Sequence, residues 1–163
     1  MADRFNTHVD YTDTLITDFF DLGFQNAFRQ YFAELGINVK DWDGLFREMN
    51  EGNEGEKNAA WVRTTADGGV IGFIQFTPIR FNSWFFEETC GFIREFWVKE
   101  EFRCRGYGSA LLALAERYFL EHGIPTSILT TDTAQRLYER YGYRRAPGCE
   151  AKNHDDVFIK RLR

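Results

Sequence analysis

A glycine-bearing loop between a predicted strand and a predicted helix constrains this sequence more than any other feature. Residues 101–109 read Glu-Phe-Arg-Cys-Arg-Gly-Tyr-Gly-Ser and directly follow the apolar run at residues 92–98. The first N–H groups of a helix have no partner inside it, and the helix dipole makes that end attractive to anions. Gly106 and Gly108 allow close backbone approach, and Arg103 and Arg105 add positive charge. A glycine pair before a helix is often a plain turn, so the neighbouring segments decide between a turn and a diphosphate site.

Short runs of aromatic and branched residues predict β-strands before the loop. They lie at residues 59–65, 70–79, 84–90 and 92–98. Asp67-Gly68-Gly69 and Asn82-Ser83 separate the runs with residues that favour hairpin turns. We therefore expect an antiparallel meander that leads into the loop.

The N-terminal third has helical spacing instead. Apolar residues recur every three or four positions over residues 15–35, with Gly36 as the expected stop and Gly23 as a candidate point of division. Residues 41–49 predict another short helix, and residues 50–57 predict a surface loop.

The C-terminal third alternates between the two types of element. The pattern predicts a helix over residues 106–121, a strand over 127–131, a helix over 132–140 and a strand over 157–162. The whole order predicts a mixed α/β (α+β) sandwich. With 163 residues and no linker-like tract, the chain is expected to form a single domain over residues 1–163.

Composition excludes several function classes. The net charge of −5 argues against non-specific nucleic-acid binding, which depends on excess Lys and Arg, and it favours a cationic substrate. No apolar stretch is long enough to predict a membrane span. The three histidines and three cysteines show no metal-ligand spacing, so no metal is expected. An odd cysteine count without a secretory signal predicts a cytoplasmic protein.

Two motifs in order resemble those of the GNAT family of acyl-CoA-dependent N-acetyltransferases. Arg103-x-x-Gly106-x-Gly108 is similar to the Q/R-x-x-G-x-G/A signature of that family, and residues 93–98 resemble its fourth strand. About thirty residues later, Thr131-x-x-Ala134-x-x-x-Tyr138-Glu139-Arg140-x-Gly142-Tyr143 resembles the family's helix that carries a tyrosine. The likeness covers residues 70–145. It implies a central, mostly antiparallel mixed sheet with helices on both faces, and acetyl-CoA as the acetyl donor. Neither of the competing glycine-loop motifs, G-x-G-x-x-G and Gly-Lys-Ser/Thr, is present.

The resemblance also assigns cofactor contacts. The diphosphate would be held by Arg103, Cys104, Arg105, Gly106, Tyr107, Gly108 and Ser109. The pantetheine arm would pair with the backbone of Phe96, Trp97 and Val98, where the N–H of Val98 is a candidate oxyanion donor. Thr131 stands where the family often has an asparagine in contact with the cofactor, and its hydroxyl would replace part of that contact.

Acetyl transfer needs a neutral amine and a proton for the departing thiolate. Deprotonating an alkyl amine at neutral pH costs about 4.6 kcal/mol, so a base should assist. Glu95 is the first candidate, because a carboxylate within an apolar strand is costly without a purpose; Glu87 and Glu88 are the alternatives. Glu95 also fits a purely structural ion pair. The family position of Tyr138 makes it the candidate acid, although a core tyrosine fits the same helix.

The acceptor has no motif of its own. The first helices and the aromatic hairpin at residues 81–88 are its expected walls, which suit a cationic amine with an apolar body. A small molecule is the expected acceptor, with a protein N-terminus or lysine as the alternative. A non-catalytic acyl-CoA-binding module also fits the motifs, and a homodimer remains open.

Overall fold

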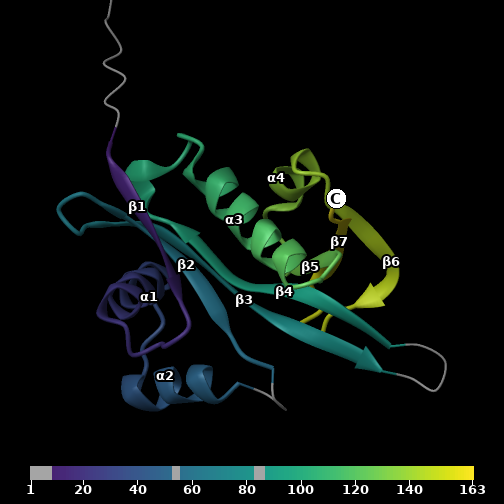
Figure 1. Cartoon of the computed structure of the whole chain (residues 1–163), viewed down its shortest axis with the longest axis horizontal. Coiled ribbons are helices and arrows are strands. Elements are labelled where there is room, and N and C mark those ends of the chain that lie inside the picture. The colour runs from purple at the N-terminus through teal and green to yellow at the C-terminus, as the bar shows by residue number, and fades with distance from the viewer. Residues whose placement is uncertain (1–8, 53–55, 83–86) are drawn as a thin grey trace, which may run out of the picture.

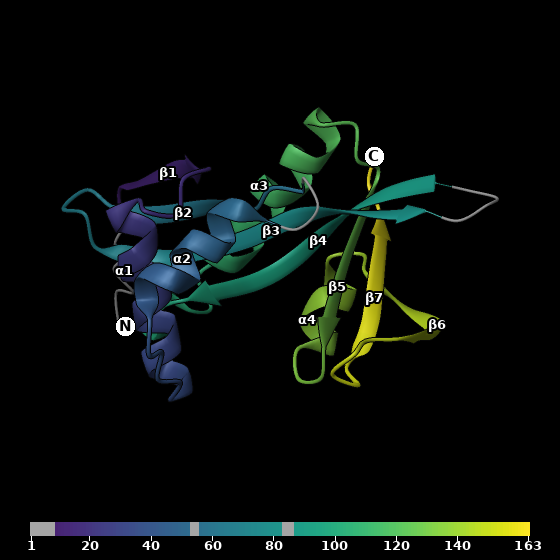
Figure 2. The ribbon, with the colours of Figure 1, turned by 90° about the horizontal axis from the view of Figure 1, so that it is seen from below.

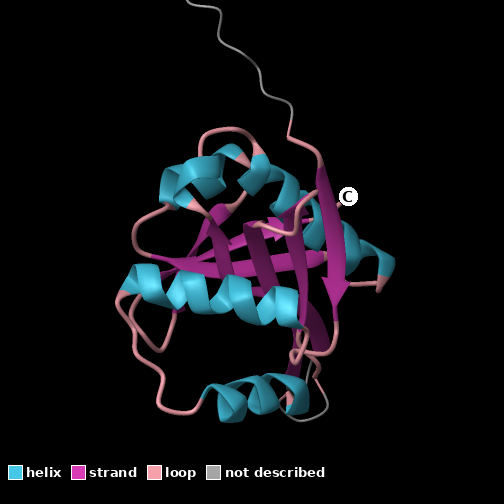
Figure 3. Cartoon of the chain, turned by 90° about the vertical axis from the view of Figure 1, so that its left-hand side faces the viewer, coloured by secondary structure: helices cyan, strands magenta, loops and turns pink. Residues whose placement is uncertain are grey.

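The chain forms one twisted mixed sheet with helices on both faces (Figure 1). The computed structural model describes residues 9–52, 56–82 and 87–163. Within these residues the seven strands are ordered β1-β2-β3-β4-β5-β7-β6. All neighbours are antiparallel except β4 and β5. Helices α1 (Leu22–Leu35) and α2 (Trp42–Glu51) bury one core, and α3 (Tyr107–Glu121) and α4 (Gln135–Arg140) bury the other. Figure 3 shows helices above and below the sheet, which confirms the predicted fold class.

The first predicted helix was wrong at its start. Tyr11–Ile16 forms strand β1, which pairs antiparallel with β2 (Ala59–Thr65). Helix α1 begins only at Leu22, where the side chain of Asp21 accepts a hydrogen bond from the N–H of Phe24. Residues 17–21, rather than Gly23, therefore divide the region, because pairing with the free edge of β2 overrides a helical periodicity that only two residues of β1 shared. The predicted stop at Gly36 is confirmed, with φ at 71°.

The central hairpin is longer and less divided than its sequence suggests. Strands β3 (Val70–Asn82) and β4 (Glu87–Val98) pair along their length, and β4 runs through Gly91 without the predicted break. A β-carbon at Gly91 would lie 2.5 Å from the ring of Phe119 on α3, so this glycine serves close packing and not a turn. The predicted turn at Asn82-Ser83 begins at the last residue of β3. The rest of that turn and the aromatic residues Trp84, Phe85 and Phe86 lie outside the described part.

Strands β4 and β5 (Thr126–Thr131) separate soon after they meet. Their parallel pairing covers only Gly91 with Ser127 and Phe92 with Ile128. Figure 2 shows the two strands diverging from that point. Residues 93–98 of β4 consequently face an opening in the sheet.

A β-bulge lies in β4 beside this opening. Gln75 pairs with Glu95, but the next residue, Phe76, pairs with Ile93, so Arg94 is the extra residue. A bulge places two consecutive side chains on the same side of a strand.

The C-terminal strands complete the sheet. Strand β7 (Asp156–Arg161) lies between β5 and β6 (Arg144–Glu150). The sequence did not predict β6, because most of its residues are exposed and Pro147 and Gly148 interrupt its strand pattern.

Candidate active site

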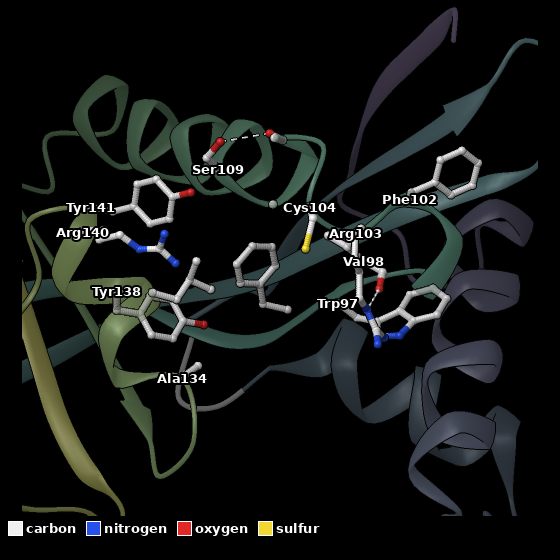
Figure 4. A pocket seen from close by; sticks show the side chains of 14 residues that line it. Trp97, Val98, Phe102, Arg103, Cys104, Ser109, Ala134, Tyr138, Arg140 and Tyr141 are labelled. Carbon is white, nitrogen blue, oxygen red and sulfur yellow. Dashed lines mark hydrogen bonds between the residues drawn. The ribbon is translucent and has the colours of Figure 1, made fainter. Parts of the chain in front are cut away.

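A cavity of about 530 Å³ occupies the opening between β4 and β5. Three segments border it: the end of β4, the loop that precedes α3, and helix α4 (Figure 4). Its lining residues are Phe96, Trp97, Val98, Phe102, Arg103, Cys104, Gly106, Gly108, Ser109, Ala134, Leu137, Tyr138, Arg140 and Tyr141. The structure thus brings together both sequence motifs, which lie about thirty residues apart.

The loop before α3 leaves the helix start open towards this cavity. Cys104 and Gly106 have φ of 60° and 84°, in the left-handed region. Helix α3 begins at Tyr107 without a side-chain cap, and its first intrahelical bond runs from the N–H of Ala110 to the carbonyl of Gly106. The N–H groups of residues 107–109 therefore lack helical partners, as an anion-binding helix terminus requires.

Arg103 contacts other parts of the protein rather than projecting alone into the cavity. Its Nε donates to the carbonyl of Val98 at 2.8 Å, and its Nη2 forms an ion pair with Glu34 on α1. The other carboxylate oxygen of Glu34 accepts from Nε1 of Trp97. Both hydrogen bonds lower the pKa of Glu34, and the bond from Trp97 has the larger effect. Arg103 thus ties the donor loop to β4 and α1, and part of its charge is neutralised.

Three predicted contact residues do not line the cavity. Arg105 is exposed, and the ring of Tyr107 packs edge-on against Phe102 and Tyr11 at 5.9 and 6.4 Å. Thr131 is buried, and its hydroxyl accepts hydrogen bonds from the N–H groups of Thr133 and Ala134. Thr131 thereby holds the turn that leads into α4, whose N-cap residue, Ala134, has no side-chain cap.

The backbone of Val98 faces the opening. The N–H of Lys99 donates to the carbonyl of Ile71 on β3 at 2.8 Å. Backbone groups of consecutive extended residues point to opposite edges, so the N–H of Val98 points away from β3. The bond from Arg103 to the carbonyl of Val98 agrees with this orientation.

Tyr138 lies across the cavity from Val98. Tyr138 is 8% exposed, and its hydroxyl points into the space between α4 and β4 (Figure 4). Burial raises the pKa of Tyr138 to about 12. The phenol therefore remains protonated at neutral pH, the form in which it can donate a proton.

Glu95 lies on the other face of β4 and does not line this cavity. Its carboxylate accepts a hydrogen bond of 2.6 Å from the hydroxyl of Tyr31 on α1. Burial raises the pKa of Glu95, while the bond from Tyr31 and the nearby charge of Arg94 partly oppose that rise. Burial also raises the pKa of Tyr31, with added contributions from Glu95 and Tyr138. Both the candidate base and the candidate acid thus raise the pKa of Tyr31.

A second cavity, of about 210 Å³, adjoins Glu95 beneath α1 and α2. Glu48, Asn58, Gln75, Arg94 and Glu95 supply its polar lining, and Phe28, Phe32, Leu45, Met49 and Gly52 supply the rest. The first helices, which the sequence predicted as acceptor walls, thus line a cavity beside Glu95.

The alternative bases lie at the far end of β4. Glu87 pairs with Arg80 at 3.1 Å, and Glu88 pairs with Arg161 at 3.4 Å. Neither residue lines either cavity.

The sequence offered no signal for Tyr31 and Glu34. Both lie on an ordinary amphipathic helix, and their partners are 64 and 69 residues away. No cluster of three or more His, Cys, Asp or Glu side chains in the described ranges has an arrangement that could bind a metal. None of the described helices is both long and apolar enough to cross a membrane.

Comparison with known proteins identifies the family. The sequence profile of the acetyltransferase (GNAT) family matches residues 15–143. A search of curated protein sequences found no significant match.

Solved structures share the fold at low sequence identity. A predicted acetyltransferase from Clostridium acetobutylicum with acetyl-CoA superposes with a TM-score of 0.70 at 15% identity, over 87% of this chain and 95% of that one. A GNAT-family acetyltransferase from Staphylococcus aureus gives 0.65 at 16% identity, over 93% and 100%. NAA60 from Arabidopsis thaliana, in complex with a bisubstrate analogue, gives 0.64 at 19%, over 93% and 98%. The profile match covers most of the chain, and the chain therefore belongs to the GNAT family of acetyltransferases.

Proposed function

We propose that this protein transfers an acetyl group from acetyl-CoA to the primary amine of a small molecule by direct attack. One observation carries the proposal. The hydroxyl of Tyr138, the outward-facing N–H of Val98 and the uncapped start of α3 all border one cavity. Family membership supports the reaction class. Because the identity to solved structures is low, the acceptor is inferred from the chemistry of the residues that line the site.

The donor side fits a nucleotide diphosphate joined to an extended arm. The open N-terminus of α3 supplies N–H donors for phosphate oxygens, and nothing lies within 4 Å of where a β-carbon of Gly106 would be. The edge of β4 at Phe96 to Val98 offers backbone groups to an amide-bearing arm, much as a neighbouring strand would. The cavity, about 530 Å³, is within the range for organic ligands, roughly 300–1,000 Å³.

Substituting Gly106 by alanine tests this donor site. Because φ is 84°, an alanine there should cost about 1–2 kcal/mol of unfolding free energy through backbone strain. Gly123 is a matched control at the opposite end of α3, with φ of 71° and nothing near its β-carbon position. Urea denaturation should show similar losses for Gly106→Ala and Gly123→Ala. Calorimetric titration with acetyl-CoA should show weaker binding only for Gly106→Ala, and equal binding by both variants would contradict the assignment.

We assign the two steps at the thioester to residues of the cavity. Acetyl-CoA supplies an activated thioester, whose carbon–sulfur bond breaks as the amine nitrogen bonds to the carbonyl carbon. In this assignment, the N–H of Val98 stabilises the oxyanion. The hydroxyl of Tyr138 gives its proton to sulfur.

We assign Glu95 the role of accepting a proton from the ammonium group of the acceptor. The amine loses two protons overall. One passes to Glu95 and then to solvent, and the other replaces the proton that Tyr138 gives to sulfur. The bond from Tyr31 keeps Glu95 ionised more easily than burial alone would allow.

Release of free CoA thiol with a panel of acceptors tests the proposal. The panel should contain alkyl amines, polyamines, amino acids, and peptides with a free N-terminus or a lysine. CoA release with small amines is expected. Release only with peptides would indicate a protein acceptor, and no release with any amine would indicate a binding module. Thermal stabilisation by CoA does not separate these cases, because each of them predicts it.

A further inference from the structure

The bulge in β4 places two opposite charges side by side in the smaller cavity. Arg94 and Glu95 both line the cavity of about 210 Å³ because Arg94 is the extra residue of the bulge. In a regular strand these two side chains would point to opposite faces. The charge of Arg94 acts on the Glu95 carboxyl, yet within the described residues the two are not joined by an ion pair.

The described surroundings leave most of the Arg94 guanidinium available for an anion. Its Nη1 donates to Oδ1 of Asn58 at 3.3 Å, a neutral partner. Asn58 is itself held in place, because its Nδ2 donates to the carbonyl of Met49 at 3.0 Å and its Oδ1 is 3.5 Å from Nε2 of Gln75. A guanidinium has five N–H donors in a planar fork that matches a carboxylate. The polar floor of the cavity therefore positions a carboxylate-binding group next to the candidate base.

The rest of the cavity limits the size and polarity of its occupant. Its volume is below the range of roughly 300–1,000 Å³ that is typical of drug-sized ligands. Phe28, Leu45 and Met49 supply apolar lining to the same cavity. A small molecule with one apolar side chain fits these features.

We infer that the acceptor is a small amino acid with an apolar side chain, whose carboxylate binds Arg94 while its amino group lies at Glu95. This inference rests on the acetyl transfer proposed above. The ammonium and carboxylate of an α-amino acid share one carbon, so they need a cation and an anion as close together as the bulge places them. Glu48 at the same cavity adds a second acid, which makes a diamine the competing acceptor.

Matched sets of compounds test the inference directly. Each set contains an amino acid, its amide and its decarboxylated amine, built on leucine, methionine and phenylalanine. The amide imitates a peptide N-terminus, and the amine lacks any carboxylate partner. In at least one set the amino acid should have a specificity constant about 10- to 100-fold above those of its two analogues, as expected for a hydrogen-bonded charge pair. Putrescine and cadaverine serve as the diamine arm.

Arg94→Gln should remove the preference, because the amino acid should lose far more of its specificity constant than the decarboxylated amine, which has no carboxylate for Arg94 to bind. Arg117→Gln, at an exposed position on α3, is the matched control and should keep the preference. Rescue by Arg94→Lys should be partial, because an ammonium lacks the fork geometry.

The contrary outcomes are separable. Equal turnover within every set, faster turnover of amides or diamines, or a preference that survives in Arg94→Gln would overturn the amino-acid assignment and leave acetyl transfer intact. If no compound turns over, the same sets are titrated calorimetrically into wild-type and Arg94→Gln protein loaded with CoA. Equal binding of the amino acids by the two proteins would overturn the assignment. Absence of CoA release across the wider amine panel would instead count against the proposed function itself.

Discussion

Tyr138→Phe is expected to lower kcat by about 10²- to 10⁴-fold, the usual contribution of a general acid. The variant loses only the hydroxyl that points into the cavity, while the ring keeps its edge-on contact with Tyr143 at 5.8 Å. Burial raises the pKa of this phenol to about 12, so wild-type enzyme should keep its acid through neutral and mildly alkaline pH. Steady-state kinetics at saturating acetyl-CoA and acceptor measure the loss.

Two further measurements restrict the interpretation of this variant. The dissociation constant for acetyl-CoA should remain close to that of the wild type, because the phenol acts on the departing thiolate and not on the diphosphate. Tyr118 on α3 packs against Phe76 on β3 and does not line the cavity, so Tyr118→Phe should leave kcat unchanged. An unaltered kcat in Tyr138→Phe would assign Tyr138 to the core and remove it from the reaction.

Glu95→Gln is expected to lower kcat/KM by about 10²-fold near neutral pH, the lower end of the general-base range. The deficit should shrink as pH rises, because more of the amine then loses its proton to solvent without help. Glu88→Gln is a matched control on the same strand, since its carboxylate pairs with Arg161 at the far end of β4. A loss in Glu88→Gln with normal turnover in Glu95→Gln would move the base to Glu88.

Tyr31→Phe should change the pH dependence through the same carboxylate. The Tyr31 hydroxyl bonds to the ionised form of Glu95 and so lowers the pKa of Glu95 against the effect of burial. Without that bond the pKa of Glu95 rises further, and the base becomes protonated at a higher pH. The acidic limb of kcat/KM should therefore move to higher pH, while the rate on the alkaline plateau stays near that of the wild type. An unmoved limb would show that Glu95 does not control it.

The local sequence pattern predicted most of the helices and strands but missed β1 and β6, the two edge strands of the sheet. The apolar periodicity of α3 and the turn residues around β2 and β3 act within a few residues, so sequence alone places them. Strands β1 and β6 are mostly exposed, and they exist because the neighbouring strands β2 and β7 offer them free edges. The single strand through Gly91 likewise depends on the approach of Phe119, which no local pattern encodes.

The sequence by itself determined the loop of the proposed donor site, and the tertiary structure decided the surroundings of the proposed acceptor site. The loop at residues 103–109 is contiguous, and its glycines and helix start carry their dihedral angles and dipole locally. The cavity proposed to hold the acceptor draws on α1, α2, β3 and β4, and its chemistry depends on one extra residue in the register between β3 and β4. That register places Arg94 beside Glu95 and brings Tyr31 to Glu95 across 64 residues. Such contacts form only when the whole sheet and its helices have assembled, because strand register is a property of paired strands and not of one segment.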